Sequence, residues 1–91
     1  MKTQVKKRDG RIEPFDREKL AAGIERAAEK RPVDAAAVES LVEEIARELA
    51  GRETRIVSST LVGELASERL RELDSVAYIR FVSVYEAFSD P

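Results

Sequence analysis

The segment VKKRDGRIEPF, residues 5–15, has the pattern of a β-hairpin and decides how the chain begins to fold. Its dipeptide Asp9-Gly10 favours a two-residue type I′ turn, because both central positions of that turn need a positive φ, which Asp-Gly tolerates. We therefore predict strands over about residues 3–8 and 11–15, one on each side of the turn.

The register that follows from this turn pairs Lys7 with Ile12 and Lys6 with Glu13. Alternation along the strands then places Lys7 on the same face as Val5 and Ile12, and Glu13 on the opposite face. A lysine on the apolar face has two explanations. It either extends past the rim of the sheet into water or points at a buried anion.

Four stretches after the hairpin have the apolar spacing of amphipathic helices, and each has a suitable N-cap residue at its start. The predicted N-caps are Asp16, Asp34, Ser59 and Asp74, and Gly51 suits a left-handed position after the second helix. The expected helices cover about residues 17–30, 34–50, 59–73 and 75–88, and a third strand covers about residues 52–57. The predicted fold class is therefore α+β, a four-helix bundle capped by a small three-stranded β-sheet.

The last predicted helix, SVAYIRFVSVYEAF (residues 75–88), is apolar around most of its circumference. Such a helix is normally covered by several neighbours. We therefore expect it to be the central helix of the bundle.

Composition predicts one domain spanning residues 1–91, with 43% apolar and 37% charged residues, as in globular proteins. The chain has no histidine and no cysteine, which excludes disulfides, metal sites built on these side chains, and histidine-based proton transfer. No apolar run approaches the roughly 20 residues of a membrane-spanning helix, so we expect no membrane partner. Cytoplasm is the default location.

Charge is unevenly distributed along the chain, although the net charge is only −2. Residues 1–11 hold five basic side chains and one acidic side chain, whereas the remaining residues hold 11 basic and 17 acidic ones. Concentrated positive potential of this kind suits a compact anion better than a long polyanion. We therefore expect no direct binding of nucleic acid by this chain.

The chemistry-bearing residues indicate binding rather than catalysis. No hydroxyl has an evident base beside it and the glycines form no phosphate-binding fingerprint, so we predict no catalytic or metal-ligating residues and no enzyme activity. Lys19, in the first turn of a helix, is mildly unfavourable there unless an anion is bound nearby. With Lys7 and Arg8 it could surround a phosphate chain, and the alternative is ordinary solvated surface. Glu13 could accept hydrogen bonds from a sugar hydroxyl or a base amino group.

The segments VKKRDGRIEPFDREKL, EKRPV and LVGELASERLRELDSVAYIRFVSVYEAF together resemble the ATP-cone, a nucleotide-sensing module of ribonucleotide reductases and of the NrdR-type repressors of their genes. The resemblance covers residues 4–89 and is closest to the NrdR type. It implies four helices under a three-stranded sheet, with a pocket for ATP or dATP between the hairpin and the bundle.

The resemblance also implies roles for individual residues. Lys7, Arg8 and Lys19 would bind the phosphates, and Val5 and Glu13 would lie near the base or sugar. Tyr85 would line the pocket, with a position in the core as its alternative, and Arg80 is a further candidate whose alternative is an ion pair to a neighbouring helix.

The function implied is that of an allosteric domain that senses ATP or dATP, with or without Mg²⁺, and controls self-association or contact with a partner. We expect a homo-oligomer. The NrdR-type zinc ribbon with its four cysteines is absent, and the chain starts within a few residues of the cone, which suggests an excised or redesigned module. The alternative function is a structural or interaction module that binds no nucleotide, and the regular, alanine-rich DAAAVESLVEEIARELA leaves that alternative open.

Overall fold

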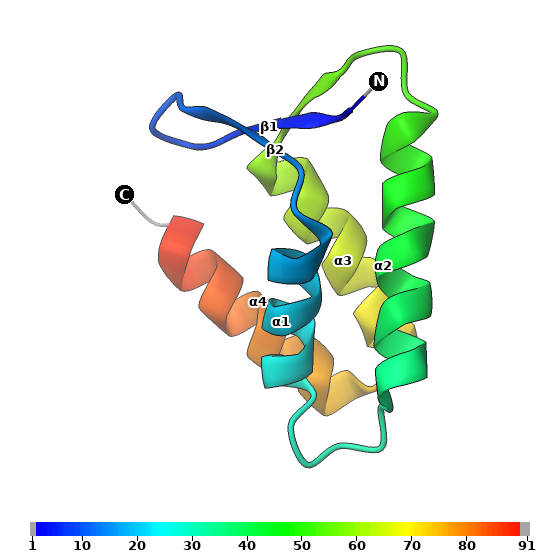
Figure 1. The fold of residues 1–91 in the computed structure, drawn as a ribbon. Helices are drawn as coiled ribbons and strands as arrows, with labels where there is room; N and C mark the ends of the chain where they lie inside the picture. The colour runs from blue at the N-terminus through cyan, green and yellow to red at the C-terminus, as the bar shows by residue number, and fades with distance from the viewer. Residues whose placement is uncertain (1, 90–91) are drawn as a thin grey trace.

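A computed structural model describes residues 2–89, with the side chains of residues 2–84, as a small sheet above four helices (Figure 1). The elements are β1 (Gln4–Lys6), β2 (Ile12–Pro14), α1 (Arg17–Ala27), α2 (Ala35–Ala50), β3 (Ile56–Ser58), α3 (Ser59–Leu73) and α4 (Ser75–Ser89). The predicted α+β class, a four-helix bundle with a three-stranded sheet, is confirmed. Each strand has only three residues and is shorter than predicted.

The sheet has the strand order β2-β1-β3 and mixed direction. β1 pairs with β2 in the antiparallel sense and with β3 in the parallel sense. Val5 of β1 lies beside Val57 of β3 in the parallel ladder. Both valines are buried, so they anchor the inner face of the sheet to the helices.

The predicted turn and register of the hairpin are wrong. Lys7 N–H donates to Arg11 O at 2.7 Å and Gly10 N–H donates to Lys7 O at 3.0 Å, which closes a three-residue turn. Only Gly10 in this turn has a positive φ, at 93°. The Asp9 carboxylate accepts from the backbone N–H of Arg11 at 3.0 Å and from its Nε at 2.6 Å, and these bonds favour the longer turn.

The altered register exchanges two side chains between the faces of the hairpin. Val5 pairs with Glu13 and Lys6 pairs with Ile12, one residue away from the predicted pairing. Ile12 therefore lies on the outer face, 50% exposed, and Glu13 lies on the inner face with Val5. Lys7 keeps its predicted place on the face of Val5.

The helix starts largely follow the predicted caps. Asp16, Asp34 and Asp74 accept hydrogen bonds from backbone N–H groups in the first turns of α1, α2 and α4. The cap of α3 is Ser58, which accepts from the Leu61 N–H at 3.0 Å. Ser59, the predicted cap, is instead the first residue of α3.

Two helix ends differ from the prediction. Gly51 has φ −82° and a right-handed conformation, because the helical geometry of α2 simply continues into its cap. α1 ends at Ala27 rather than near residue 30. Among the described residues other than glycine, Lys30 has a left-handed conformation, with φ 63°. It reverses the chain before α2.

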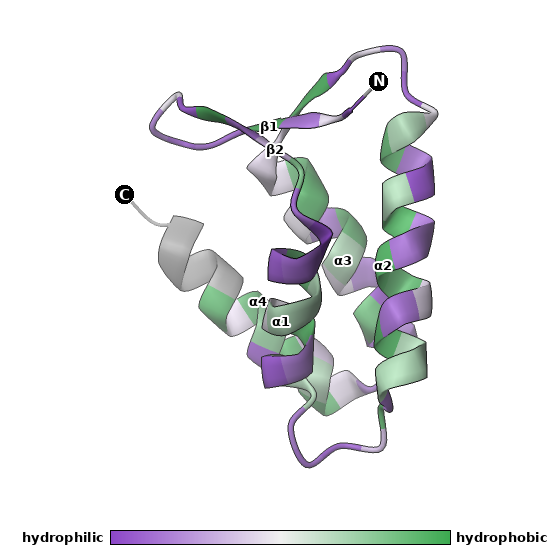
Figure 2. Ribbon diagram, viewed as in Figure 1, coloured by the Kyte–Doolittle hydropathy of each residue, from purple (hydrophilic) through white to green (hydrophobic). Residues whose placement is uncertain are grey.

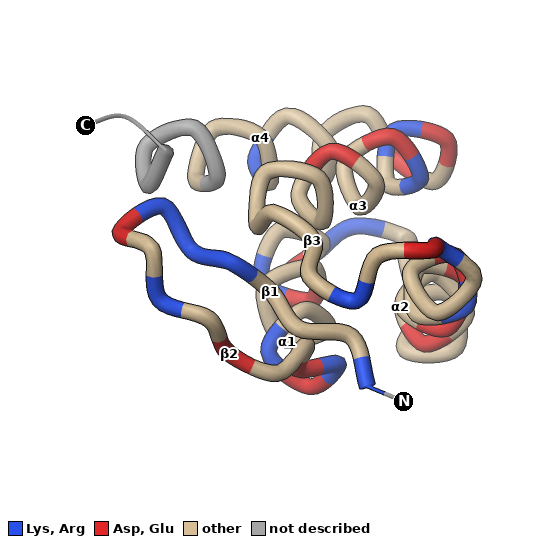
Figure 3. Tube along the Cα trace, turned by 90° about the horizontal axis from the view of Figure 1, so that it is seen from above, with Lys and Arg blue, Asp and Glu red and all other residues tan. Residues whose placement is uncertain are grey.

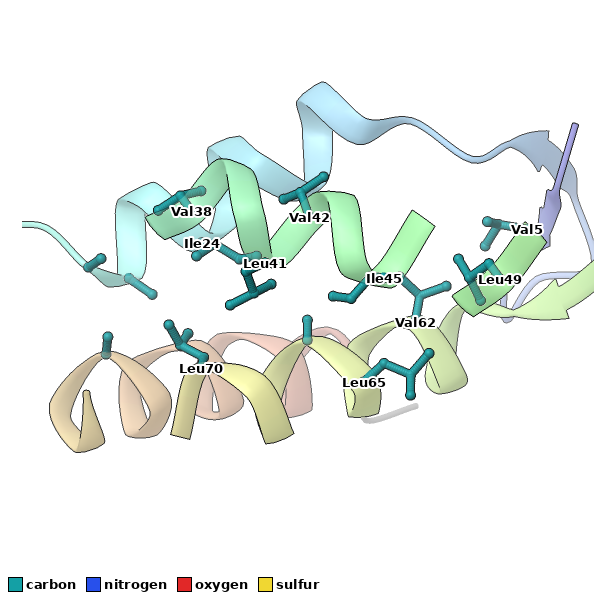
Figure 4. Packing of buried hydrophobic residues seen from close by; sticks show 14 of the residues in the cluster. Val5, Ile24, Val38, Leu41, Val42, Ile45, Leu49, Val62, Leu65 and Leu70 are labelled. Atoms are coloured by element: carbon teal, nitrogen blue, oxygen red, sulfur yellow. The ribbon is translucent and has the colours of Figure 1, made fainter. Parts of the chain in front are cut away.

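The core lies between two layers of helices. In Figure 4, side chains from α1 and α2 meet side chains from α3, and Val5 lies at the end of the core nearest the sheet. The helices contact one another in a ring from α1 through α2 and α3 to α4 and back to α1. Figure 2 shows hydrophobic and hydrophilic residues alternating along α2, whose buried residues are Val38, Leu41, Val42, Ile45, Ala46 and Leu49.

The prediction that the last helix is central is wrong for the described side chains of α4. Ala77 is fully buried, but Ile79 and Val84 are 60% and 51% exposed. α4 packs on α3 and α1, one on each side, so the ring leaves its outward face uncovered. The apolar residues that suggested a central position therefore lie partly on the surface.

Candidate functional site

The hairpin, the start of α1 and the start of α3 enclose a cavity of about 250 Å³, called here the hairpin cavity. Most of its lining is apolar, and comes from Val5, Pro14, Phe15, Leu20, Val62 and Phe81. The remaining lining residues are Lys7, Glu13, Asp16, Lys19, Ser59 and Gly63. An apolar hollow with a few polar groups at its border is the usual form of a small-molecule site.

Lys7 and Glu13 reach this cavity because they share the inner face of the hairpin with Val5. Both side chains are half-buried. The Glu13 carboxylate lies 3.3 Å from Nη1 of Arg11, so it already has one cationic neighbour. Glu13 is therefore the acceptor that the hairpin brings to the cavity, beside the cation of Lys7.

Lys19 reaches the same cavity from the first turn of α1. The Asp16 cap holds that turn in place, since its carboxylate accepts from the backbone N–H of Lys19 at 3.1 Å. Neither Lys7 nor Lys19 forms an ion pair with any side chain among residues 2–84. Two lysines from separate elements thus converge on one hollow without a carboxylate partner.

A second hollow, of about 730 Å³, adjoins the first between α1 and α4, and is called here the α1–α4 groove. Lys7, Lys19 and Phe81 line both hollows. The other residues of the groove are Gly23, Arg26, Ala27, Ile79, Arg80, Ser83 and Val84. The two lysines therefore stand at the boundary between an apolar cavity and a more open, cationic groove.

Arg80 lies in this groove and also contacts the end of α1. Its Nη1 donates to the carbonyl of Glu29 at 2.8 Å and to that of Ala27 at 3.4 Å. A cation at a helix C-terminus is favourable because unpaired carbonyls give that end partial negative charge. The sequence suggested either nucleotide binding or an ion pair to a neighbouring helix for Arg80. The observed contact is to a neighbouring helix, but its acceptors are backbone carbonyls and not a carboxylate.

The roles predicted for two further residues, Arg8 and Tyr85, stay predictions. Arg8 is exposed in the hairpin turn and is not among the residues that line either hollow. Its assignment to phosphate stays a prediction. The side chain of Tyr85 lies outside the described residues, so its predicted place in the pocket is likewise a prediction.

Figure 3 shows Lys and Arg along much of the hairpin, interrupted by acidic positions, whereas the helices carry both signs of charge. At the tip of the hairpin, Arg11 is held by Asp9 and Glu13. Hydrogen bonds from Arg11 hold the pKa of Asp9 below its usual value, so the carboxylate stays ionised. The charge of Arg11 is therefore largely compensated, and Lys7 is the hairpin cation that faces the cavity.

Sequence reasoning missed several lining residues, of which Arg26 and Phe81 matter most. A signal for Arg26 was present, because Lys19, Gly23 and Arg26 follow one another at i, i+4 and i+7 and so share one face of α1. Phe81 had no such signal. Its place depends on how α4 is packed against α1.

Comparison with known proteins identifies the family. The model of the ATP cone domain matches residues 3–91, which is nearly the whole chain. The chain belongs to the ATP-cone family. It is a regulatory, nucleotide-sensing domain of this family and not an enzyme.

Relatives of this ATP-cone domain include proteins named transcriptional repressor NrdR. The chain is 69% identical over 88 residues to the one from Halomicrobium mukohataei, covering 97% of the chain and 54% of that relative. It is 67% identical over 88 residues to the one from Halorubrum lacusprofundi, with the same coverage of 97% and 54%. For the one from Chloroflexus aurantiacus the identity is 49% over 86 residues, covering 94% of the chain and 52% of the relative. The ATP-cone chain thus spans about half the length of these relatives.

Two further observations concern the described part of this ATP-cone. None of its helices is both long and apolar enough to cross a bilayer. Within the same residues, no three carboxylates gather into a group that could hold a metal ion.

Proposed function

We propose that this ATP-cone binds one adenine nucleotide, ATP or dATP, in the hairpin cavity, with Lys7 and Lys19 on its phosphates. The convergence of these two lysines on one hollow is the observation that carries the proposal. Two ammonium groups that form no ion pair with a described side chain lie at the border of an apolar cavity. They attract a polyanion that also has an apolar part, and a nucleotide has both. Each charge-assisted contact contributes roughly 1.5 to 3 kcal/mol.

The base and sugar would occupy the apolar side of the cavity. Val5 offers a buried surface against which a flat ring can pack, and Glu13 offers an acceptor for an amino group or a hydroxyl. By the resemblance to the ATP-cone, Arg8 would also bind the phosphates and Tyr85 would line the pocket. Any Mg²⁺ would be bound through the phosphates.

The proposed output is a change in association. The nucleotide would contact the hairpin, α1 and α3 together, so it would favour one arrangement of these elements. The exposed apolar side chains of α4, Ile79 and Val84, are suited to burial against a second copy, and we propose a homo-oligomer whose stability depends on the bound nucleotide.

The relatives named as repressors support a role in transcriptional control, which would be exerted through a longer protein. The net charge of −2 supports the proposal that this part makes no direct contact with DNA. Control of ribonucleotide reductase genes and a cytoplasmic location are part of the same proposal, because a repressor acts where the chromosome is.

Isothermal titration calorimetry with ATP and dATP tests the binding step. Replacing Lys7 or Lys19 by Ala should weaken binding about tenfold or more, a loss of at least roughly 1.4 kcal/mol. Lys6→Ala is the matched control, since Lys6 is the neighbouring lysine on the exposed face of the same strand. Its affinity should stay within about twofold of the unchanged chain.

The proposal is contradicted if the chain without substitutions binds neither ATP nor dATP below millimolar concentration. Its thermal melt would then also be insensitive to millimolar ATP, because only a ligand that prefers the folded state stabilises it. That pair of results would leave the interaction module without nucleotide as the function. Molar mass measured by light scattering during the same titration tests the association step separately.

A further inference from the structure

The α1–α4 groove is lined by two arginines in addition to the two lysines that it shares with the hairpin cavity. Four cationic side chains line it, namely Lys7, Lys19, Arg26 and Arg80, and no carboxylate is among its described lining residues. None of the four forms an ion pair with another described side chain. Like charges left together without partners raise the energy of the surface unless an anion joins them.

The cations are arranged as a series leading away from the hairpin cavity. Lys19 and Arg26 lie on the same face of α1, separated along the helix axis by about 10 Å at 1.5 Å per residue. Gly23 lies between them, and a Cβ added there would have Phe81 Cε1 as its nearest neighbour, at 4.0 Å. Gly23 adds no side chain to the groove, and Phe81 lies beside it. The volume of the groove, about 730 Å³, leaves room for an extended anion between α1 and α4.

Arg80 provides the opposite wall, and its guanidinium is already oriented. The carbonyls of Glu29 and Ala27 hold Nη1, so the plane of the group is restrained before any ligand arrives. The N–H groups on Nε and Nη2 have no partner among the described residues. A guanidinium uses its donors as a rigid fork, and phosphate oxygens match that geometry.

We propose that the α1–α4 groove receives the distal phosphates of the nucleotide, and that Arg26 and Arg80 distinguish a triphosphate from a monophosphate. The proposal rests on the function proposed above, which places the base in the hairpin cavity and the first phosphates at Lys7 and Lys19. Because both lysines line both hollows, a phosphate chain that begins between them continues into the groove. A monophosphate ends at the lysines and reaches neither arginine.

The alternative for Arg80 is a structural role alone, as a cation that stabilises the C-terminus of α1. The two roles give different results in a series of ligands. A structural residue affects AMP and ATP equally, whereas a residue that reads the length of the phosphate chain affects ATP and leaves AMP unchanged.

The experiment is calorimetric titration of the 91-residue chain with AMP, ADP and ATP at one ionic strength. The variants are Arg26→Ala and Arg80→Lys, the latter keeping a cation near the end of α1 while removing the fork. Arg47→Ala is the matched control, because Arg47 is an exposed arginine in the last turn of α2 as Arg26 is in the last turn of α1. Thermal melts establish that each variant is folded.

The unchanged chain should bind ATP at least tenfold more tightly than AMP. Each groove variant should reduce the ratio of Kd for AMP to Kd for ATP by about fivefold or more, with the Kd for AMP unchanged within about twofold. Arg47→Ala should leave the ratio unchanged. If Arg80→Lys does not fold, Arg26→Ala decides the matter, because its side chain is exposed.

If a folded groove variant keeps the same ratio of Kd for AMP to Kd for ATP, the arginines do not distinguish a triphosphate from a monophosphate. Nucleotide binding itself would still stand. Equal losses for AMP and ATP would lead to the same conclusion, and would assign Arg80 to structure alone. If the unchanged chain binds no nucleotide at all, the function proposed for the hairpin cavity fails first, and this inference fails with it.

Discussion

Asp74 shows how much one side chain contributes at the junction of α3 and α4. Its Oδ2 accepts from the Ala77 N–H at 2.9 Å, which caps α4. Both carboxylate oxygens also accept from Arg31, each at 2.9 Å, and the Asp74 side chain is only 7% exposed. The Arg31 guanidinium holds the pKa of Asp74 below its usual value, and the same pair raises the pKa of Arg31.

This lowered pKa predicts how stability depends on pH. A carboxyl group with a pKa lower in the folded than in the unfolded chain, where it is about 3.9, stabilises the fold above that pH and loses the contribution as pH falls through the folded value. Asp74→Asn should therefore be less stable than the unchanged chain at pH 7, and the difference should shrink below about pH 4. Urea denaturation from pH 7 to pH 2 measures it. A difference independent of pH would show that the ion pair does not contribute.

Gly23 provides a second prediction at the scale of single residues. A glycine inside a helix costs about 0.5 to 1 kcal/mol relative to alanine, and an added Cβ at this position would lie at ordinary contact distance from Phe81. Gly23→Ala should raise the free energy of unfolding by about that amount, and the melting temperature by about 4 °C. Scanning calorimetry checks it, and a lower melting temperature would mean that Phe81 cannot accommodate the methyl group.

At the scale of elements, the hairpin shows how a turn controls a site. The Asp9 carboxylate selects a three-residue turn, and the register that results brings Glu13 to the inner face. A two-residue turn would have placed Ile12 there. One residue in the turn therefore decides which side chain borders the proposed nucleotide.

Gly10 gives the prediction for this element. Its φ of 93° is unfavourable for any residue with a Cβ, so Gly10→Ala should destabilise the chain by about 1 kcal/mol. Gly51→Ala is the control, because Gly51 has φ −82° and alanine adopts that conformation without strain. Urea denaturation midpoints compare the two. Equal effects would contradict the special conformation of Gly10.

At the scale of the whole molecule, the ring of helices makes the shared core responsible for stability. Leu70 is fully buried, whereas Leu73 in the same helix is 45% exposed. Leu70→Ala should cost about 2 to 5 kcal/mol, a large part of the 5 to 15 kcal/mol typical of a domain. Leu73→Ala should change stability by less than about 0.5 kcal/mol. Chemical denaturation of both variants tests the position of the core, and a similar cost for the two would contradict it.

The ring of helices also explains why the apolar composition of α4 led to the wrong prediction that this helix is central. Val76, Tyr78, Phe81 and Val82 are half-buried, and Ile79 and Val84 are exposed. A helix that is apolar all round is expected to be covered on all sides, but its cover need not come from its own chain. We propose that the exposed face of α4 is covered on association.

The sequence by itself determined which elements form and where most of them begin. Caps such as Asp16 and Asp34 act within one turn, and the apolar spacing of α2 is a property of consecutive residues, so neither depends on distant contacts. The presence of a basic hairpin and the face on which Lys7 lies follow from equally local rules.

Only the tertiary structure decided which side chains share a space. Lys7 and Lys19 line one cavity because the hairpin and α1 are packed around it, and Arg80 reaches the end of α1 because α4 closes the ring. Such neighbours are set by packing between elements far apart in the chain. Many weak contacts add up to fix that packing, so no single residue determines it. A local pattern can therefore name the candidates, and packing decides whether they form one site.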